Sequence, residues 1–447
     1  MSGFQASLVR SAFIYSLPLA EIYRQTSLSQ LTESRLNRLM PYRDLLDATY
    51  RKVPSPNNDT LYTAFGFDLS EGPLVVQAPP IPPDRYFVLP FYDAFTNVFA
   101  SYGTRMGTTD GVNLLLTPPG YDGPVPPGLT ELRSPSFIGV MLGRILVQGP
   151  EDLDAVHTIQ DRFVVEPLDG WLKGVRTPAL DVKHPQPVPG FTFFDTRNNP
   201  EGFWQGVGEI IVGTPVPDTD RELFDTFAPL GLTQEGFTFP EDPDERALLL
   251  QETEASWKFI ADFTADQSAA EAHGVKFFNS NGWGWPSAVR DPQNVGRTSY
   301  GENYLVRAWV NYLYYGMLPS DEALYPAVYT DADGARLHGD HTYTLTLPAT
   351  GRPVRENGFT SVTLYGDDGY FVPNPQNTYK IGDRDRDLVT DADGNTVITI
   401  SAERPTHATN WLPAPRGGLF YLMYRAYLPV DTVLDGTHTF PGVHKVR

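Results

Sequence analysis

The stretch FYLMYRAYLP at residues 420–429 is almost entirely apolar and aromatic. An apolar run that is bounded by turn signals is typical of a buried β-strand. Three shorter runs of similar character precede it: YTLTLP at 343–348, SVTLYG at 361–366 and TVITIS at 396–401. The sequence DADG, at 331–334 and 391–394, is typical of the turn in a β-hairpin. We therefore predict a β-rich C-terminal domain over residues 323–447.

Residues 51–170 have a similar pattern and are predicted to form another β-rich domain. Short apolar runs are separated there by clusters of Pro and Gly, as in APPIPPDRY at 78–86 and TPPGYDGPVPPG at 117–128. Turns at such intervals are typical of an antiparallel sandwich or barrel. The whole chain has 39 Gly and 41 Pro among 447 residues. Because both residues are unfavourable in helix interiors, an all-helical bundle is not expected.

Two other parts of the chain are predicted to be mainly helical. Residues 1–50 form an N-terminal helical segment, because apolar residues recur there at helical spacing. Residues 171–322 form a Pro-rich linker followed by a helical region. Its helices are expected over residues 220–227, 242–270 and 300–317, and the last of them is unusually aromatic.

The composition argues against several classes of protein. There are 34 basic and 54 acidic residues, which give a formal charge of −20. This balance argues against binding to nucleic acid and to an anionic membrane surface. Hydrophobic residues make up 41% of the chain, which is enough to form a folded core. The absence of cysteine excludes disulfides, thiolate nucleophiles and thiolate metal sites.

The N-terminal sequence leads us to predict a cytoplasmic protein. Arg10 interrupts the apolar run, and Glu21 and Arg24 follow closely, so the stretch lacks the pattern of an export signal. No stretch approaches the roughly 20 apolar residues that a membrane-spanning helix needs. The absence of cysteine also fits this location.

Sequence motifs for cofactors and metals are missing. There is no glycine-rich dinucleotide or phosphate loop and no GxSxG elbow. A calcium loop that starts at Asp331 or Asp391 needs Glu at its twelfth position, where the chain has Thr342 and Ala402. No HExxH pair occurs among the eight histidines. We therefore predict no cofactor and no metal site.

Five stretches place polar residues among aromatic residues or at turns. They are PNNDTLY at 56–62, YDAFTNVF at 92–99, FNSNGWGWP at 278–286, IGDRDR at 381–386 and NWLPAP at 410–415. Taken singly, each stretch fits a structural role, because polar residues near turns commonly bond to the backbone. Taken together they favour a functional site, since Asp and Arg inside aromatic strands are costly unless they are paired or used.

The order of these stretches resembles a known family. With them occur FYDAFTNVFAS at 91–101, GRILVQGPEDLDAVHTIQDRF at 143–163, YGENYLVRA at 300–308, LYP at 324–326, FVPNPQNTYKIGDRD at 371–385 and NWLPAPRGG at 410–418. The chain resembles the bacterial two-domain proteins that carry domain of unknown function 1254 followed by domain of unknown function 1214, over about residues 10–430. The resemblance implies an α+β, β-rich fold with two antiparallel jelly-roll-like β-sandwich domains and an intervening helical region. Many members carry an export signal, which this chain is predicted to lack.

The chain departs from the family pattern in one informative place. Where the middle helix of the family usually has Ala and Gly, this chain has aromatic residues over 304–315. Such a change reshapes any cavity that the helix lines and indicates a specialised branch of the family.

Our first functional hypothesis is an enzyme that needs no cofactor and acts on a hydrophobic or aromatic small molecule. It would be an acid–base hydrolase, lyase or isomerase, with secondary metabolism as its expected context. Asp59 is the candidate general acid or base, and Arg144 or Arg384 would hold an anionic group or a developing oxyanion. Tyr62 would donate a hydrogen bond. The predicted substrate-binding residues are Asn58, Tyr92, Asn97, Trp283, Tyr304, Arg307, Trp309, Asn410 and Trp411.

Two alternatives remain open at this point. In the first, the chain is a carbohydrate- or small-ligand-binding protein without catalysis, in which Trp283 and Trp285 stack on a sugar while Asn279 and Asn281 bond its hydroxyls. In the second, the motifs only hold the two sandwiches together. In either functional reading the predicted partner is a small molecule, with no nucleic acid and no membrane, and homo-oligomerisation is left open.

Overall fold

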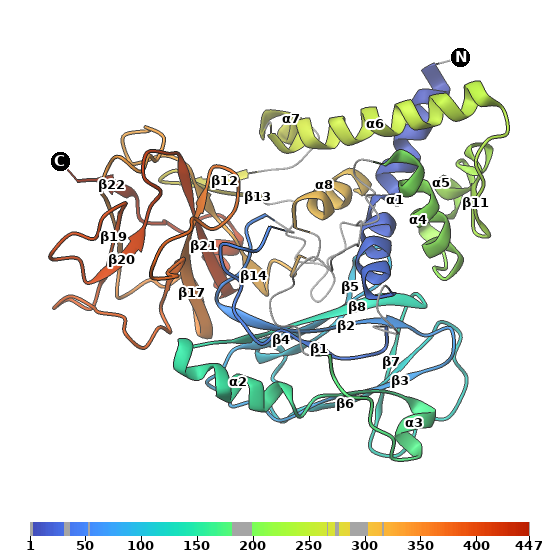
Figure 1. The fold of residues 1–447 in the computed structure, drawn as a ribbon, viewed down its shortest axis with the longest axis horizontal. Helices are drawn as coiled ribbons and strands as arrows, with labels where there is room; N and C mark the ends of the chain where they lie inside the picture. Colours follow the sequence, from blue (N-terminus) through green and yellow to red (C-terminus); the bar gives the residue numbers. More distant parts are fainter. Residues whose placement is uncertain are drawn as a thin grey trace.

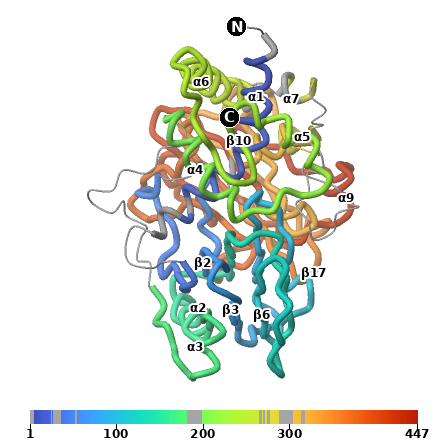
Figure 2. Tube along the Cα trace, turned by 90° about the vertical axis from the view of Figure 1, so that its right-hand side faces the viewer, coloured from blue at the N-terminus to red at the C-terminus, as the bar shows by residue number. Residues whose placement is uncertain are grey.

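The structure is a computed structural model that describes residues 3–30, 36–51, 54–180, 199–265, 267–272, 277–286, 303–314 and 317–446. It has three parts: a first β-sandwich, a C-terminal β-sandwich beside it, and a group of helices above the first sandwich (Figure 1). The view turned by 90° shows the helices at the opposite end of the molecule from α2 and α3 (Figure 2).

The first sandwich consists of a five-stranded and a four-stranded sheet. The five-stranded sheet has the order β1 (Met40–Pro41), β2 (Thr60–Asp68), β8 (Ile138–Leu146), β4 (Phe87–Tyr92) and β5 (Val98–Gly103). The four-stranded sheet has the order β7 (Thr130–Arg133), β6 (Val112–Thr117), β3 (Leu74–Ala78) and β9 (Val164–Pro167). Short helices follow and connect these strands: η1 (Thr104–Met106), η2 (Pro150–Asp152), α2 (Leu153–Gln160) and α3 (Leu168–Leu172).

The two faces of the five-stranded sheet pack against different parts of the chain. Successive side chains of a strand point to opposite faces. Phe65 and Phe67 of β2 therefore pack against the four-stranded sheet, in one core with Leu114 of β6. The other face carries Tyr62 directly opposite Arg144. We call this other face, with Tyr62, Val88, Tyr92, Val140, Leu142 and Arg144, the inner face.

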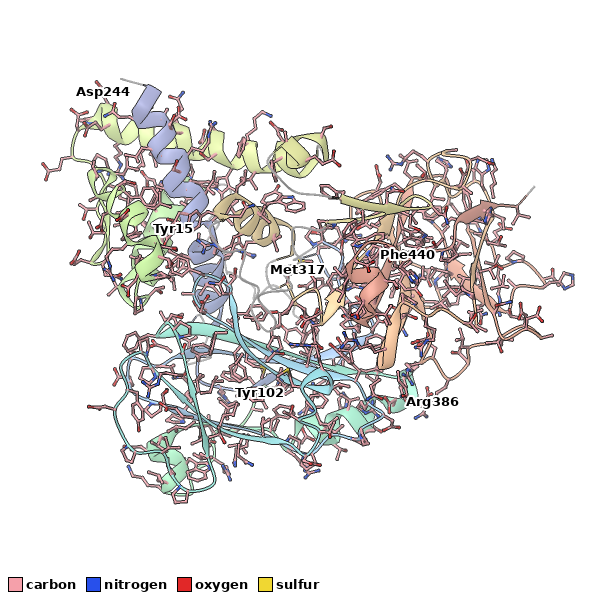
Figure 3. The ribbon with its side chains drawn as sticks, turned by 180° about the vertical axis from the view of Figure 1, so that it is seen from behind. Tyr15, Tyr102, Asp244, Met317, Arg386 and Phe440 are labelled. Carbon is pink, nitrogen blue, oxygen red and sulfur yellow. The ribbon has the colours of Figure 1, made fainter. Side chains whose placement is uncertain are left out.

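The inner face is turned toward the C-terminal sandwich and the helices. Val88 packs in one buried cluster with Phe359 and Tyr427 of the C-terminal domain. The hydroxyl of Tyr92 donates a hydrogen bond of 3.3 Å to the backbone oxygen of Met317. Seen from behind, Met317 lies between Tyr15 of α1 and Phe440 of the C-terminal sandwich (Figure 3).

The C-terminal sandwich is built around the apolar run at residues 420–429. This run forms β21 (Phe420–Pro429), and all ten of its residues are buried. Its sheet has the order β12 (Phe277–Ser280), β13 (Trp283–Pro286), β15 (Ala327–Val328), β21, β17 (Val354–Gly366) and β18 (Lys380–Gly382), and β14 (Ala323–Leu324) also pairs with β21. The facing sheet has the order β20 (Asn410–Pro413), β19 (Thr396–Ser401), β16 (Tyr343–Leu347) and β22 (Val443–Lys445), and α9 (Asp431–Leu434) follows β21.

The helical part joins segments that lie far apart in the sequence. Helix α1 (Gly3–Gln30) packs against helices that come some 170 to 300 residues later. The other elements are α4 (Pro200–Val212), η3 (Asp218–Asp220), α5 (Arg221–Asp225), η4 (Ala228–Leu230), β10 (Leu232–Thr233), β11 (Gly236–Phe237), α6 (Pro243–Ala265), α7 (Gln267–Ala272) and α8 (Tyr304–Tyr314). Phe13 of α1 shows the packing, because its ring stacks on Phe203 of α4 and meets the edge of Trp257 of α6.

The α+β, β-rich fold with two sandwiches and a helical region is confirmed. Pairing is mainly antiparallel, but β6 pairs with β7 and β19 with β20 in parallel. The N-terminal segment differs from the prediction for residues 1–50, because α1 ends at Gln30 and residues 36–51 form turns and β1. No helix of the described ranges is long and apolar enough to cross a membrane.

Candidate functional site

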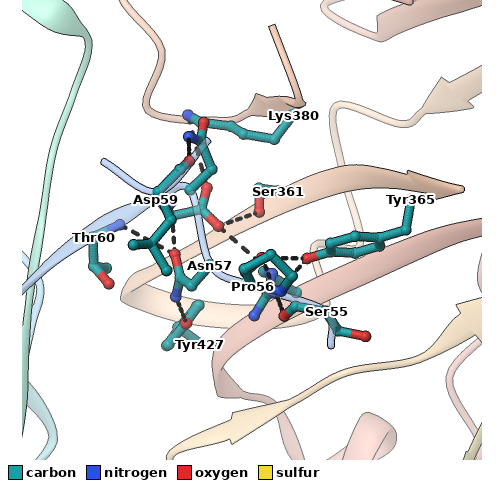
Figure 4. A network of polar contacts seen from close by, with 12 residues as sticks. Ser55, Pro56, Asn57, Asp59, Thr60, Ser361, Tyr365, Lys380 and Tyr427 are labelled. Atoms are coloured by element: carbon teal, nitrogen blue, oxygen red, sulfur yellow. Dashed lines mark hydrogen bonds and ion pairs between the residues drawn. The ribbon is translucent and has the colours of Figure 1, made fainter. Parts of the chain in front are cut away.

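The turn before β2 reaches across to the C-terminal domain. Asn57 accepts hydrogen bonds through Oδ1 from the backbone N–H groups of Asp59 (2.6 Å) and Thr60 (3.2 Å). This is the local turn that an Asn at such a position favours. The side-chain amide of Asn57 also donates to the hydroxyl of Tyr427 at 2.7 Å (Figure 4). One residue thus shapes the turn and fixes it to β21.

Asp59 lies at the junction of the two sandwiches and is only 1% exposed. Ser361 of β17 donates a hydrogen bond of 2.8 Å to its Oδ2 atom. Two cations flank the carboxylate: Lys380 Nζ lies 3.7 Å from Oδ1 and Arg425 Nε lies 3.9 Å from Oδ2. Asp59 is therefore a buried and paired carboxylate whose side-chain contacts join the first domain to the second (Figure 4).

Lys380 is held between two carboxylates. It pairs with Asp59 and, more closely, with Asp385, which also accepts the backbone N–H of Gly382 at 2.7 Å. Burial opposes the charged form of Lys380, but the attraction of both carboxylates outweighs it and raises its pKa. Burial also raises the pKa of Asp385. Asp385, in the alternating IGDRD sequence, is therefore a member of this ion-pair network.

Arg425 is a functional candidate that our reading of the sequence missed. Its Nη2 atom donates to the backbone oxygens of Ser55 (2.8 Å) and Pro56 (3.1 Å) and to the hydroxyl of Tyr365 (2.6 Å). A signal was present, because Arg425 is the one charged residue in the apolar strand FYLMYRAYLP. A cation at such a place must find partners in the interior.

A second arginine, Arg144, lies on the inner face among tyrosines. Its guanidinium carbon lies 5.6 Å from the centre of the Tyr62 ring, and it donates to the hydroxyl of Tyr92. Tyr325 and Tyr427 are its other strong electrostatic neighbours, and their hydroxyls are bonded to one another. We call these five residues the Arg144 group.

The Arg144 group keeps an arginine charged beside neutral phenols. Burial opposes the charge of Arg144, but an arginine stays protonated in proteins, and the hydroxyl oxygens of its tyrosine neighbours favour the charge. Burial is also the main cause that raises the pKa of Tyr92, Tyr325 and Tyr427. These phenols therefore stay protonated at neutral pH and can donate hydrogen bonds. Such a group can bind an anionic or partly anionic oxygen.

The inner face is partly accessible to solvent around this group. Arg144 itself is 6% exposed, whereas Tyr62, Leu142 and Tyr325 are half-buried. Half-buried apolar and aromatic side chains beside a buried cation are the residue types that line small-molecule sites.

Helix α8 carries three of the predicted binding residues into the helical part. The Arg307 guanidinium lies within 5.3 Å of the ring centres of Tyr15, Phe95 and Tyr304. Burial lowers its pKa. Tyr304 donates a hydrogen bond of 2.8 Å to Asp220. Trp309 packs against Phe263 and Phe277 instead.

Trp283 does not form the open stacking surface that the sugar-binding alternative requires. It lies on β13 with an exposed fraction of 0%, and Trp285 is 1% exposed. Both rings pack on Phe440 inside the C-terminal sandwich. The Gly-rich stretch suggested an exposed loop, but alternation along β13 directs both tryptophans into the core. Asn281 bonds to the backbone oxygen of Phe440.

Other predicted binding residues support the backbone. Asn410 bonds to the backbone of Val389 and Val397, and Trp411 donates to Ser401. Asn58 donates to the backbone oxygen of Leu46, and Asn97 bonds to Asp93. These contacts place the four residues outside the Arg144 group, and their binding roles stay predictions.

Arg384 also lies apart from the Arg144 group. It lines a pocket of about 260 Å³ at one end of the C-terminal sandwich, and this pocket shares no lining residue with the Arg144 group. Within the described ranges, the structure has no group of three or more His, Cys, Asp or Glu residues that could hold a metal ion.

Fold and site together define an α+β protein with two β-sandwiches and a buried arginine–tyrosine group where they meet. Two family models match the chain, both described as protein of unknown function: DUF1254 at residues 36–167 and DUF1214 at residues 322–431. Together they cover more than half of the chain. The chain therefore belongs to the two-domain family in which these domains follow one another in this order.

A solved structure supports the fold. The chain is similar to the VPA0106 protein from Vibrio parahaemolyticus, with a TM-score of 0.71 and 23% identity over 99% of this chain and 100% of that chain. An uncharacterised protein from Burkholderia cenocepacia has a TM-score of 0.43 and 13% identity over 98% of this chain and 88% of that chain. No curated protein matches the chain.

Proposed function

We propose that this chain is an enzyme that acts without a cofactor on a small hydrophobic or aromatic molecule. The reaction is of the acid–base type, as in a hydrolase, lyase or isomerase. The observation that carries the proposal is Arg144, a buried and charged arginine on the inner face with tyrosine hydroxyls around it.

The Arg144 group supplies what an oxyanion needs. The guanidinium of Arg144 offers planar N–H donors and a full positive charge. The hydroxyl of Tyr62 or Tyr325 would donate a further hydrogen bond to the same oxygen. Aromatic rings and Leu142 on the same face would cover the apolar body of the substrate.

In this proposal Asp59 is the candidate general acid or base. Its contacts with Ser361, Lys380 and Arg425 also fit a residue that positions β2 against the second domain. In the proposal, the anion-binding role of Arg144 does not depend on which of these roles Asp59 has.

The first test measures binding and conversion of bicyclic acids. The full chain is incubated with 1-naphthoate and 2-naphthoate, and with the neutral analogues 1-naphthamide and 2-naphthamide. Binding is followed by thermal shift and conversion by mass spectrometry. We expect the acids to bind and the neutral analogues to bind at least about tenfold more weakly, because a charge-assisted hydrogen bond contributes about 1.5–3 kcal/mol.

Variants connect the binding to Arg144. Arg144→Met should lose the preference for acids, while Arg144→Lys should retain part of it because the charge is kept. Arg336→Met is the matched control, since Arg336 also lies over a tyrosine ring, at 5.8 Å from Tyr329, but is 47% exposed in its side chain. Equal binding of acids and neutral analogues would contradict the anion site. Binding without conversion would favour the ligand-binding alternative over the enzyme.

A further inference from the structure

We infer that the C-terminal sandwich has a second ligand site, in which Arg384 binds a small aromatic or other apolar carboxylate. The site is the pocket of about 260 Å³ at one end of this sandwich. The pocket is formed by the β16–β17 connection, β18 and the turn after it, the first residue of β19, and residues 438–441. Thr360 of β17 and Tyr424 of β21 line it from one sheet, and Leu347 of β16 and Thr396 of β19 line it from the facing sheet.

The pocket carries one positive charge that is not compensated. Arg352 pairs with Asp383, which also accepts the backbone N–H of Thr360 at 3.0 Å, so these two charges cancel. Arg384 is half-buried, and its bonds go through Nη2 to two backbone oxygens, those of Gly358 (2.8 Å) and Glu356 (3.1 Å). Among the residues that the structure describes, no carboxylate forms an ion pair with Arg384.

A specific irregularity of β17 holds Arg384 in place. The register between β17 and β21 shifts between Val354 and Phe359, which marks a β-bulge. The bulge contains both residues whose backbone oxygens bond to Arg384. Gly358 is required there, since a Cβ atom on it would lie 2.2 Å from the backbone oxygen of Tyr427. Bulges of this kind occur next to binding sites, where they redirect a side chain or a backbone group.

The rest of the lining is aromatic and apolar and would contact the uncharged part of the ligand. Tyr424 and Phe440 provide aromatic surface, with ring centres 5.2 Å apart. His438 packs against the Phe440 ring, at 4.7 Å between centres. Burial lowers its pKa, so the imidazole is neutral at pH 7. Leu347, Ile381 and Leu388 complete the apolar lining.

Charge and size together point to a single-ring monoanion. The pocket has one net positive charge in a chain whose formal charge is −20, so an anion is favoured here and not over the general surface. The volume is below the usual range for drug-sized ligands, about 300–1,000 Å³. A carboxylate matches the planar donors of an arginine, and one ring fits between the aromatic walls. This inference does not depend on the function proposed for the Arg144 group.

The test uses the full chain with para-fluorobenzoate and para-fluorobenzamide, and binding is measured by fluorine NMR. We expect the acid to bind at least about tenfold more tightly than the amide, because only the acid has a charge to pair with Arg384. The imidazole proton signals of His438 should shift on titration with the acid, because His438 lines the same pocket.

Variants separate this site from the Arg144 group. Arg384→Met should weaken binding of the acid at least about tenfold. Arg416→Met is the matched control and should bind as the wild type does, since Arg416 belongs to the same domain but is 76% exposed in its side chain. In Arg144→Met the imidazole signals of His438 should still shift on titration with the acid, because His438 lines the pocket of Arg384 and is not part of the Arg144 group. Thr439→Trp, at an exposed position of the lining, should block the pocket while it leaves Arg384 in place.

Three outcomes would overturn the inference. The first is equal binding of acid and amide, and the second is unchanged binding in Arg384→Met and in Thr439→Trp. In the third, Arg144→Met abolishes binding of the fluorinated acid and Arg384→Met does not, which would place the anion in the Arg144 group. Should Arg384→Met fail to fold, as judged by circular dichroism, Thr439→Trp and the His438 signals still decide the result.

Discussion

At the scale of single residues, the carboxylate of Asp59 links the first sandwich to the second. Its carboxylate is flanked by Lys380 and Arg425, whose side chains are 11% and 6% exposed. Removal of one member of a buried ion pair leaves the others without compensation, which costs about 3–5 kcal/mol. We therefore expect Asp59→Asn to lower the free energy of unfolding by about 3 kcal/mol or more, measured by urea denaturation.

Asp340→Asn is the control for this prediction, because the Asp340 side chain is 64% exposed beside His338. A purely catalytic role for Asp59 predicts a different result, namely loss of activity with a melting temperature within a few degrees of the wild type. An Asp59→Asn variant with wild-type stability would therefore show that the ion pairs of Asp59 do not stabilise the junction.

Polar residues that are buried and paired could be singled out from the sequence, but their partners could not. Asp59 could be found, because it precedes an apolar strand within a cluster of polar residues. Ser361, which donates to it, is 302 positions away, and no local spacing relates the two. For Trp283 the prediction of sugar stacking was wrong. Stacking on a sugar needs an exposed ring, but the alternation of side chains along β13 buries the ring of Trp283.

At the scale of elements, the turn between β4 and β5 was hidden inside an aromatic sequence. YDAFTNVF at 92–99 reads as a continuous strand, but Thr96 has a φ of 63° and the chain reverses there. Asp93 stabilises this turn: its Oδ1 atom accepts the backbone N–H groups of Phe95 and Asn97, each at 2.9 Å. Aromatic residues on both sides of the turn concealed its signal.

The same Asp93 should make this hairpin sensitive to pH. Burial raises the pKa of Asp93 from 3.8 to about 6, although bonds from Asn97 and the nearby Arg307 oppose the rise. Between these two values the folded state binds more protons than the unfolded state, so stability falls as the pH rises. Relative to Asp93→Asn, the free energy of unfolding of the wild type should fall by about 3 kcal/mol between about pH 4 and pH 6. It should change little outside this range.

Chemical denaturation at a series of pH values measures this difference directly. Asp391→Asn is a suitable control, because bonds from the backbone of Asn395 lower the pKa of Asp391. Its stability difference from the wild type should be level from pH 4 to pH 6. If the difference in free energy of unfolding between Asp93→Asn and the wild type does not change from pH 4 to pH 6, then burial does not raise the pKa of Asp93.

At the scale of the whole molecule, the two sandwiches share one continuous interior. Tyr86 and Val88 of the first domain pack in one cluster with Phe359 and Tyr427 of the second. The buried Glu322 also accepts hydrogen bonds from Tyr86 at 2.7 Å and from Arg105 at 2.6 Å, and so adds a polar link. The two β-rich regions could be predicted from turn spacing, but this shared interior could not, since it depends on contacts between distant segments.

We therefore expect the sandwiches to unfold together. Scanning calorimetry should give a single transition for the wild type, because a large apolar contact couples neighbouring domains. Phe359→Ala should broaden or split that transition, since the Phe359 ring stacks on Tyr427 at 4.3 Å and meets Tyr86 at 5.2 Å. Tyr329→Ala, at a site that is 47% exposed, should leave one transition. Two separate transitions in the wild type would contradict the coupling of the two sandwiches.

The position of α1 has a consequence for biosynthesis. Its residues Val9, Phe13 and Leu17 are at most 1% exposed, yet the helices that cover them, α4, α6 and α8, end between residues 212 and 314. A ribosome that adds about 5–20 residues per second needs roughly 15–60 s to complete the last of these partners. For that time α1 has only part of the native surface that it packs on, so the nascent chain depends on a chaperone or on transient contacts of its own to remain soluble.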